Sequence, residues 1–398
     1  MKEGWEYIDF KDVYPISMGK TPPRGDKSSW DVNKETHNKW VSIADISQNE
    51  GGIINNTKEY ISDIAAERIR KVAKGSLLMS FKLSIGRMAF AGDDLYTNEA
   101  IIAIPEVERY GLKFMYYYLL SYDWVSLTQG NEKVKGATLN KGSIGKIQLP
   151  ILPLSEQEEI VSYLDSSFAK IDALKAKAEE GLKNAKALFQ AELTKAMTPQ
   201  EGWEEKKLGD CFPIIRNGAN IKQTKGAGGI PITRIETLSG GVFNSDRLGY
   251  ADINDIEKYS QHILNDGDLL MSHINSVDFV GRTVPYHEQV TPLIHGMNLL
   301  RLVPNEIGLS DFYYYLFLTK DFKKSIRAIT HKSVNQASFN ITALKAISIP
   351  IPPLSTQEVI VTHLDAVSEK CKALEANYTK QIQLCDDMKQ ALLRQVFE

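Results

Sequence analysis

Residues 151–165, ILPLSEQEEIVSYLD, return 200 positions later as residues 351–365, IPPLSTQEVIVTHLD. Ten of these fifteen positions are identical. A repeat of this period is much longer than the units from which solenoid proteins are built. It therefore predicts a duplicated module, in which each of two globular halves ends in a long helix.

The repeat continues through the rest of the chain. Gly4-Trp5-Glu6 returns as Gly202-Trp203-Glu204, and Gly86-Arg87 returns as Gly281-Arg282. Tyr116-Tyr117-Tyr118-Leu119 has an echo in Tyr313-Tyr314-Tyr315-Leu316. Between such anchors the two halves differ almost completely, as expected for one scaffold with different loops. Two similar domains with different surfaces predict two similar but non-identical ligands.

This repeat divides the 398 residues into four segments. We expect globular domains at 1–150 and 199–350, hereafter the first and second domains, and helical spacers at 151–198 and 351–398. Each segment of one half has its counterpart in the other half, which predicts an internal pseudo-twofold repeat.

Local patterns predict a mixed secondary structure. Stretches 40–46, 75–81 and 99–105 are typical of short buried strands, whereas 111–128 and 308–325 are typical of helices. Because helices and strands do not alternate regularly, the pattern favours an α+β fold over a doubly wound sheet. The two tyrosine runs have helical spacing, which favours a place in the core over stacking on bases.

The composition bounds the class of protein. Hydrophobic residues make up 43% of the chain, and we find neither an apolar run of eighteen residues nor a signal pattern. We therefore expect a cytoplasmic protein with no membrane segment. The cysteines Cys211, Cys371 and Cys385 have no metal-ligand spacing and are expected in the core. The net charge of −3 argues mildly against nucleic-acid binding, but basic residues gather at 319–345.

Each long helix has an expected start signal. Ser155 with Glu158, and Ser355 with Glu358, fit the capping box. The first helix is expected to reach about Met197, a length of roughly 60 Å. Apolar stripes at heptad-like spacing predict that the two helices pair as an antiparallel coiled coil. The positions expected to pair the helices or to bind a partner are Val161, Leu164, Phe168, Ile171, Leu182, Ile360, Leu364, Leu374, Tyr378 and Leu392.

The motifs PLSEQEEIVSYLD and PPLSTQEVIVTHLD resemble those of the specificity subunits of type I restriction-modification systems. The resemblance covers the whole chain. It implies that each variable domain reads one half of a bipartite, asymmetric target in double-stranded DNA. It also implies that the helices set the gap and recruit two methyltransferase subunits, which endonuclease subunits join. S-adenosylmethionine would bind to the methyltransferase partner, with no cofactor on this chain.

The motifs of a base methyltransferase are missing from the sequence. We find no Asn/Asp-Pro-Pro-aromatic motif, and Gly19-Lys20-Thr21 lacks the second glycine of a phosphate loop because position 14 is Tyr. The seven histidines show no metal-binding spacing, so no metal site is expected. We therefore expect a non-catalytic chain. The alternative is an interaction scaffold with two ligand-binding domains on a coiled-coil rod and no DNA.

Basic and polar residues in glycine- or asparagine-containing loops are the candidate DNA contacts. Arg87 and Arg282 occupy equivalent positions after glycine, which predicts either a shared role on phosphates or a shared structural salt bridge. The long, charged loop at 20–40 departs from the family pattern, so contacts there cannot be carried over. The full set of candidates is Lys20, Arg24, Lys82, Arg87, Lys133 and Lys135 in the first domain, and Arg216, Lys222, Lys225, Arg234, His273, Arg282, Lys332 and Asn335 in the second.

Overall fold

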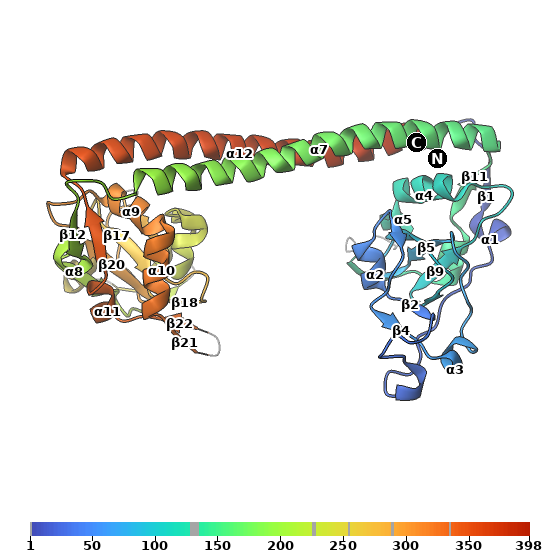
Figure 1. Ribbon diagram of the computed structural model, residues 1–398, viewed down its shortest axis with the longest axis horizontal. Helices are drawn as coiled ribbons and strands as arrows, with labels where there is room; N and C mark the ends of the chain where they lie inside the picture. Colours follow the sequence, from blue (N-terminus) through green and yellow to red (C-terminus); the bar gives the residue numbers. More distant parts are fainter. Residues whose placement is uncertain (1, 128–134, 225–227, 254, 288–289, 334–335) are drawn as a thin grey trace. The chain divides into compact units, whose positions relative to one another are not determined.

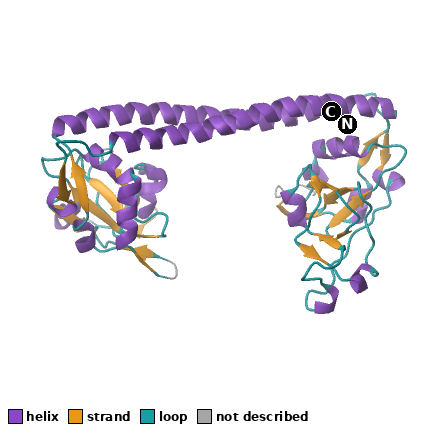
Figure 2. Ribbon diagram, viewed as in Figure 1, coloured by secondary structure: helices purple, strands orange, loops and turns teal. Residues whose placement is uncertain are grey.

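The computed structural model describes residues 2–127, 135–224, 228–253, 255–287, 290–333 and 336–398 (Figure 1). The chain folds into two compact units. The first unit comprises residues 1–179 and 380–398, and the second comprises residues 180–379. Helices and strands occur together in both units, which confirms the α+β class (Figure 2).

The first unit is built around a four-stranded sheet in the order β3-β7-β5-β9. Every residue of the central strand β5 is buried, and both neighbours of β5 run antiparallel to it. A small sheet of β1 and β11 closes the domain immediately before helix α7. The elements up to that point are β1 (Tyr7–Asp9), α1 (Phe10–Val13), η1 (Lys27–Ser29), β2 (Lys39–Val41), α2 (Ile43–Gln48), β3 (Ile53–Ile54), β4 (Glu59–Tyr60), α3 (Asp63–Ala66), β5 (Leu77–Ser80), β6 (Lys82–Ser84), β7 (Met88–Ala91), β8 (Tyr96–Thr97), β9 (Ile101–Ile104), α4 (Leu112–Ser121), α5 (Trp124–Leu127), β10 (Lys135–Thr138), α6 (Lys141–Gly145) and β11 (Gln148–Pro150).

Two predicted elements of the first domain need correction. The strand expected at 40–46 ends at Val41, because Ser42 and Asp45 form a capping box that starts helix α2. The helix expected at 111–128 is divided into α4 and α5, because the backbone of Tyr122 is extended. The strands expected at 75–81 and 99–105 are confirmed as β5 and β9.

The second unit repeats this scaffold. Its main sheet has the order β13-β20-β17-β19, and β12 pairs with β23 as β1 pairs with β11. The helix expected at 308–325 is again two helices, because Thr319 is extended and caps the second one. The elements are β12 (Glu204–Lys207), α8 (Leu208–Cys211), β13 (Ile214–Asn217), β14 (Gln223–Thr224), β15 (Ile230–Ile232), η2 (Ile235–Gly241), η3 (Ser245–Arg247), β16 (Gly249–Ala251), η4 (Glu257–His262), β17 (Leu269–Ser272), β18 (Ile274–Asn275), β19 (Thr283–Pro285), β20 (Leu299–Val303), α9 (Ser310–Leu318), α10 (Lys320–Ile329), β21 (His331–Lys332), β22 (Ala337–Ser338), α11 (Ile341–Lys345) and β23 (Ser348–Ile351).

Helices α7 (Leu154–Ala196) and α12 (Leu354–Phe397) each contribute to both units and pair with each other inside each one. In the first unit, Lys175 bonds Asp386 at 2.6 Å and Asp172 bonds Lys389, so the pairing is antiparallel. In the second unit His363 lies 3.0 Å from Glu192. The predicted antiparallel coiled coil is therefore confirmed.

The buried seam of the paired helices follows a strict seven-residue spacing. On α12 it includes Leu364, Cys371 and Cys385, which confirms that these cysteines belong to the core. Leu374 lies off this seam and is 39% exposed, so of its two expected roles, helix pairing or partner binding, partner binding stays a prediction. Of the other predicted positions, Leu164, Ile171, Ile360 and Leu364 are buried, and Val161, Phe168, Leu182, Tyr378 and Leu392 are partly buried.

The starts of the two long helices differ from the expectation. Helix α7 begins at Leu154 and α12 at Leu354, so Ser155 and Ser355 lie inside the first turn and the predicted capping boxes are wrong. The buried Gln157 fastens the start of α7 instead. Its side chain donates to the carbonyls of Arg109 and Leu152 and accepts from the amide of Gly111. Gln357 makes the same three kinds of bond in the second unit.

The tyrosine runs attach the short helices to the long ones. Tyr117 donates from Oη to Asp165 at 2.6 Å, and Tyr315 donates to Asp365 at 2.6 Å. Both tyrosines are buried, which confirms their place in the core. The matching bonds show that Tyr117 corresponds to Tyr315, at an offset of 198 residues. The sequence echo instead pairs Tyr116 with Tyr313, at an offset of 197, so the structural alignment of the two runs differs from it by one residue.

Candidate nucleic-acid interface

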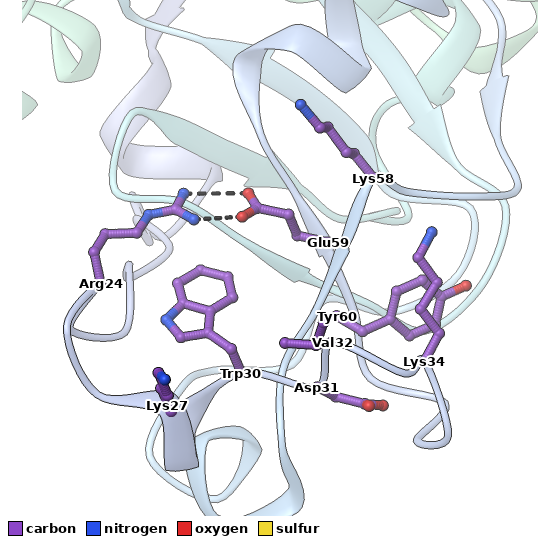
Figure 3. Close-up of a pocket in the computed structure, with 9 residues that line it drawn as sticks. All are labelled: Arg24, Lys27, Trp30, Asp31, Val32, Lys34, Lys58, Glu59 and Tyr60. Carbon is purple, nitrogen blue, oxygen red and sulfur yellow. Dashed lines mark hydrogen bonds and ion pairs between the residues drawn. The ribbon is translucent and has the colours of Figure 1, made fainter.

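The first domain contains a cationic and aromatic pocket of about 350 Å³ (Figure 3). The long loop before β2 supplies one wall and β4 supplies the other. This loop is longer than its counterpart between Ala219 and Pro231 in the second domain. The lining residues are Arg24, Lys27, Trp30, Asp31, Val32, Lys34, Lys58, Glu59 and Tyr60.

Arg24 organises this pocket from inside. Its guanidinium forms a two-pronged pair with Glu59 and lies 4.2 Å from the ring centroid of Trp30 and 5.0 Å from that of Trp40 (Figure 3). The indole of Trp30 also donates to the carbonyl of Pro23 at 3.1 Å. A guanidinium that is paired and stacked in this way holds the loop in one conformation. The prediction that Arg24 touches DNA stays a prediction.

Other groups of the same pocket are free to meet a ligand. Lys27 and Lys58 are exposed and form no ion pair within the described residues. Val32 is 87% exposed, which is unusual for an aliphatic side chain beside a pocket. An apolar group flanked by lysines suits a thymine methyl between two phosphates.

The remaining first-domain candidates are scattered. Lys20 is exposed, and its amide donates to the carbonyl of Thr97. Lys82 is half-buried on β6, with its amine 5.5 Å from the ring centroid of Phe81. Arg87 pairs with Glu50 at 3.3 Å. Lys135 begins β10, which pairs with β6, whereas Lys133 lies outside the described residues.

The second domain has a different pocket, of about 390 Å³, beside the sheet β18-β22-β21. Its polar lining includes Asn217, His273, His331 and Ser338. His273 is only 8% exposed, and its Nδ1 has no hydrogen-bond partner among the described residues. Burial lowers the pKa of His273, so the ring is neutral near pH 7. The Nδ1 atom is itself buried, whereas Asn217 beside this ring is exposed, and its amide can both donate to and accept from a base edge.

The structure brings His273 and Lys332 to one region of the second domain, because Lys332 lies on β21 next to this pocket. Arg216 instead bonds the side chain of Gln261 at 2.7 Å, and Arg234 lies 3.6 Å from Glu236. Lys222 is exposed. Arg282 lines a different cavity, which shares no lining residue with this pocket. Lys225 and Asn335 lie outside the described residues.

Several site residues were missed from the sequence. Lys27, Trp30 and Val32 belong to the first pocket, and His331 belongs to the second. The length difference between the two loops would have indicated the first group. His331 lies within the basic stretch 319–345, next to the predicted Lys332.

Metal-ligand clusters and membrane-spanning helices are both missing from the part of the chain that the structure describes. Among the described residues, no three His, Cys, Asp or Glu side chains are grouped so that they could hold a metal ion. Within the same ranges, no helix is both long and apolar enough to cross a membrane.

Comparisons with known sequences agree with each other. The family model for the type I restriction modification DNA specificity domain matches twice, over residues 2–184 and 200–384. The putative MjaX specificity subunit of Methanocaldococcus jannaschii is 38% identical over 199 residues, which are 50% of this chain and 46% of that protein. The EcoKI specificity subunit of Escherichia coli K12 is 25% identical over 66% of this chain and 60% of its own length. The chain thus matches about half to three fifths of the length of these two relatives.

Solved structures show the same fold. A chain from a study of complex assembly and conformational transition of the type I R-M system superposes with a TM-score of 0.76 at 17% identity, covering 100% of this chain and 98% of that one. The HsdS subunit of Thermoanaerobacter tengcongensis gives a TM-score of 0.55 at 17% identity, with coverage of 100% and 97%. The two matches to the family model together span most of the sequence of this protein, which therefore belongs to the family of type I restriction-modification DNA specificity proteins.

Proposed function

We propose that this chain is the sequence-specific, non-catalytic DNA-binding subunit of a type I restriction-modification complex. Each domain reads one half of a bipartite, asymmetric target in double-stranded DNA. The observation that carries this proposal is the pair of unlike pockets on one repeated scaffold. One pocket is cationic and aromatic around Trp30, and the other holds imidazole, amide and hydroxyl groups around His273.

The chemistry of the pockets supports different half-sites. In the first domain, Val32 provides the apolar contact for a thymine methyl, and Lys27 and Lys58 bind the flanking phosphates. In the second domain, the exposed side chain of Asn217, beside the neutral ring of His273, exchanges hydrogen bonds with a base edge. Because the two sets of groups differ, the two half-sites differ in sequence and the target is not a palindrome.

The faces of the long helices support two methyltransferase subunits as partners. In the first unit, Leu174 of α7 and Met388 of α12 are exposed, and their repeat counterparts in the second unit, Leu374 and Leu188, are exposed as well. Exposed apolar residues at equivalent positions suit two copies of one partner. The partners bind S-adenosylmethionine and transfer its methyl group, and endonuclease subunits join through them. The helix length sets the gap between half-sites, and the complex acts on DNA in the cytoplasm.

A base-resolution map of adenine methylation tests the proposal. The map would be made in cells that express this chain with its methyltransferase, and a chain-free strain would be the control. We expect a bipartite, asymmetric motif that disappears without this chain. Two identical half-sites would contradict the assignment of unlike readers to the two domains. A stable complex that leaves the DNA unmethylated would favour an interaction scaffold that does not bind DNA.

The partner faces have their own test. The variant Leu174→Glu with Met388→Glu should lower the number of bound methyltransferase subunits from two to one, as measured by native mass spectrometry. The matched control is Leu154→Glu, which changes another exposed leucine of α7 that is not level with Met388. Two bound subunits in both variants would contradict these faces as docking sites.

A further inference from the structure

The second domain contains a cationic cavity of about 300 Å³ that the proposed base reading does not use. Helix α10 forms one wall, and η2 and the segment leading into β19 form the others. Three cations line this cavity: Arg282, Lys323 and Arg327. The carboxylate at the cavity is that of Asp278, which is exposed.

Helix α10 separates apolar and cationic residues on its two faces. Phe322 and Ile326 are buried against the domain core, whereas Lys320, Lys323, Lys324 and Arg327 are exposed. Positions three and four residues apart lie on one face of a helix, so these four cations form a continuous stripe. None of them forms an ion pair within the ranges that the structure describes. Desolvation, with a smaller contribution from the nearby Arg327, lowers the pKa of Lys323.

Arg282 is the third cation of the cavity. Its guanidinium lies 4.3 Å from the ring centroid of Phe279, and Nη1 donates to the carbonyl of Leu238 at 3.4 Å. No carboxylate neutralises it among the described residues. The exposed ring of Phe279 supports the guanidinium from one side, so its other face is left for a ligand.

The first domain lacks this arrangement at the equivalent point. Arg87, the counterpart of Arg282, is paired with Glu50, and Ser239 of the second domain stands where Glu50 does. Gly86 contacts Trp124 of α5, just as Gly281 contacts Ile326 of α10. Helix α5 reads WVSL and carries no cation, whereas α10 carries four. The cationic cavity is therefore a property of the second domain.

Three cations around one cavity, with the exposed Asp278 as the carboxylate at its lining, favour an anionic ligand over a neutral one. The position of α10 in the chain indicates which anion, because Thr330 alone separates its last residue from β21, which borders the His273 pocket. We propose that this cavity binds a backbone phosphate of the half-site read by the second domain, and that α10 thereby fixes the register of the His273 pocket on the bases. The inference rests on the proposed function. It adds an anchor to the second domain for which the first has no equivalent.

The test uses the complex with methyltransferase subunits and a duplex that carries the mapped motif. The variant is Lys323→Gln with Arg327→Gln, which keeps good helix formers on the exposed face and leaves Phe322 and Ile326 in place. The control is Lys206→Gln with Lys207→Gln, the same charge change on β12 of the same unit, no residue of which lines the cavity. Equal melting temperatures would verify that all three proteins fold.

We expect the cavity variant to bind the duplex about tenfold more weakly than the control at 150 mM salt. Each lost phosphate contact reduces the slope of log affinity against log salt by about 0.9, so the slope should fall by nearly two. The loss should be similar for cognate and mismatched duplexes, because phosphates carry no sequence information. Asp278→Asn should tighten binding by removing a repelling carboxylate.

Two outcomes would overturn the inference while the proposed function stands. One is an affinity and salt slope equal to those of the control. The other is that inorganic phosphate, compared with chloride at equal ionic strength, raises the melting temperature of the wild-type protein but not of the variant, while both bind DNA equally well. The cavity would then hold a free anion. If the wild-type complex itself fails to bind the motif, the proposed function is wrong as well.

Discussion

Glu50 of the first domain and Ser239 of the second stand at the same point of the repeated scaffold, each beside an arginine that follows a glycine. Glu50 neutralises Arg87 at 3.3 Å, whereas within the described residues Arg282 contacts a carbonyl and an aromatic ring and no carboxylate. Because Ser239 stands where Glu50 does, Arg282 lacks the carboxylate partner that Arg87 has. The two domains share one backbone scaffold, and single residue differences decide which positions of that scaffold can contact the ligand.

The two sheets differ in the same manner in their interiors. Arg301 of β20 pairs with Asp268 at 2.7 Å, and both side chains are almost fully buried. The register of the first sheet puts Ala103 and Ser76 at these positions. Arg301→Ala should therefore destabilise the second unit by about 3–5 kcal/mol, because it leaves a buried carboxylate without its partner. Denaturant unfolding measures this loss.

The double variant Asp268→Ser with Arg301→Ala is the informative control, since it installs the first-domain pair in the second domain. It should recover at least about 1 kcal/mol relative to Arg301→Ala, because no charge then remains buried. A double variant less stable than the single one would show instead that Asp268 stabilises the sheet without Arg301, through the bond that it accepts from the amide of Asn265 at 2.7 Å.

Buried histidines distinguish the second domain under acid. His295 is fully buried where the first domain has Thr97, and its Nε2 lies 2.9 Å from the carbonyl of Leu299. Burial, with the nearby His262 and Arg301, lowers the pKa of His295 to about 3. A histidine whose folded pKa is depressed favours the unfolded chain as soon as pH falls below the unfolded value. Between pH 7 and pH 5 this one group should cost the second unit about 2 kcal/mol.

Thermal unfolding followed from pH 7 to pH 5 measures this effect, with His295→Gln as the matched variant. Glutamine can still donate to the carbonyl of Leu299 but does not titrate in this range. The variant should lose some stability at pH 7 and show a flatter dependence on pH. His37→Gln, the same substitution in the first domain, is the control. An equal slope in the wild type and His295→Gln would place the acid sensitivity elsewhere.

The parts of the molecule that could be predicted are those that local pattern determines. Repeated motifs and heptad spacing predicted two α+β units and paired helices, because burial of an apolar stripe leaves few alternatives. The helix starts were predicted wrongly, since Gln157 and Gln357 bond to carbonyls about fifty residues earlier in the chain. The role of Arg87 depended on Glu50, 37 residues away in sequence. Only the fold brings such pairs together. The sequence could therefore predict which kinds of residue belong to the candidate site, but not which residues contact one another.

The loop around Trp30 has no counterpart of equal length in the second domain, and Arg24 offers a way to disturb it alone. Arg24→Ala should loosen the loop by about 1 kcal/mol, because it removes a two-pronged ion pair and stacking on the partly exposed Trp30 and the buried Trp40. Hydrogen exchange should show faster exchange of amides at 20–37, and methylation maps should show relaxed selectivity at the first half-site alone. Lys27→Ala should weaken binding without changing exchange. Altered selectivity at the second half-site would contradict this division of labour.

Exchanging Glu50 and Ser239 between the two domains tests whether these residues decide which arginine can bind a phosphate. Ser239→Glu should pair with Arg282 and remove one phosphate contact from the second domain, whereas Glu50→Ser should release Arg87 and add one to the first. Each change should shift the salt slope by about 0.9 in opposite directions, with affinity changes of about two- to threefold at 150 mM salt. Glu236→Gln, which alters another carboxylate near the same cavity wall, is the control for net charge. Because the two exchanges have opposite signs, their combination should restore the wild-type slope with the anchor moved from one domain to the other. If both single variants weaken binding, both side chains serve folding, and the arginines do not differ in the way the two domains suggest.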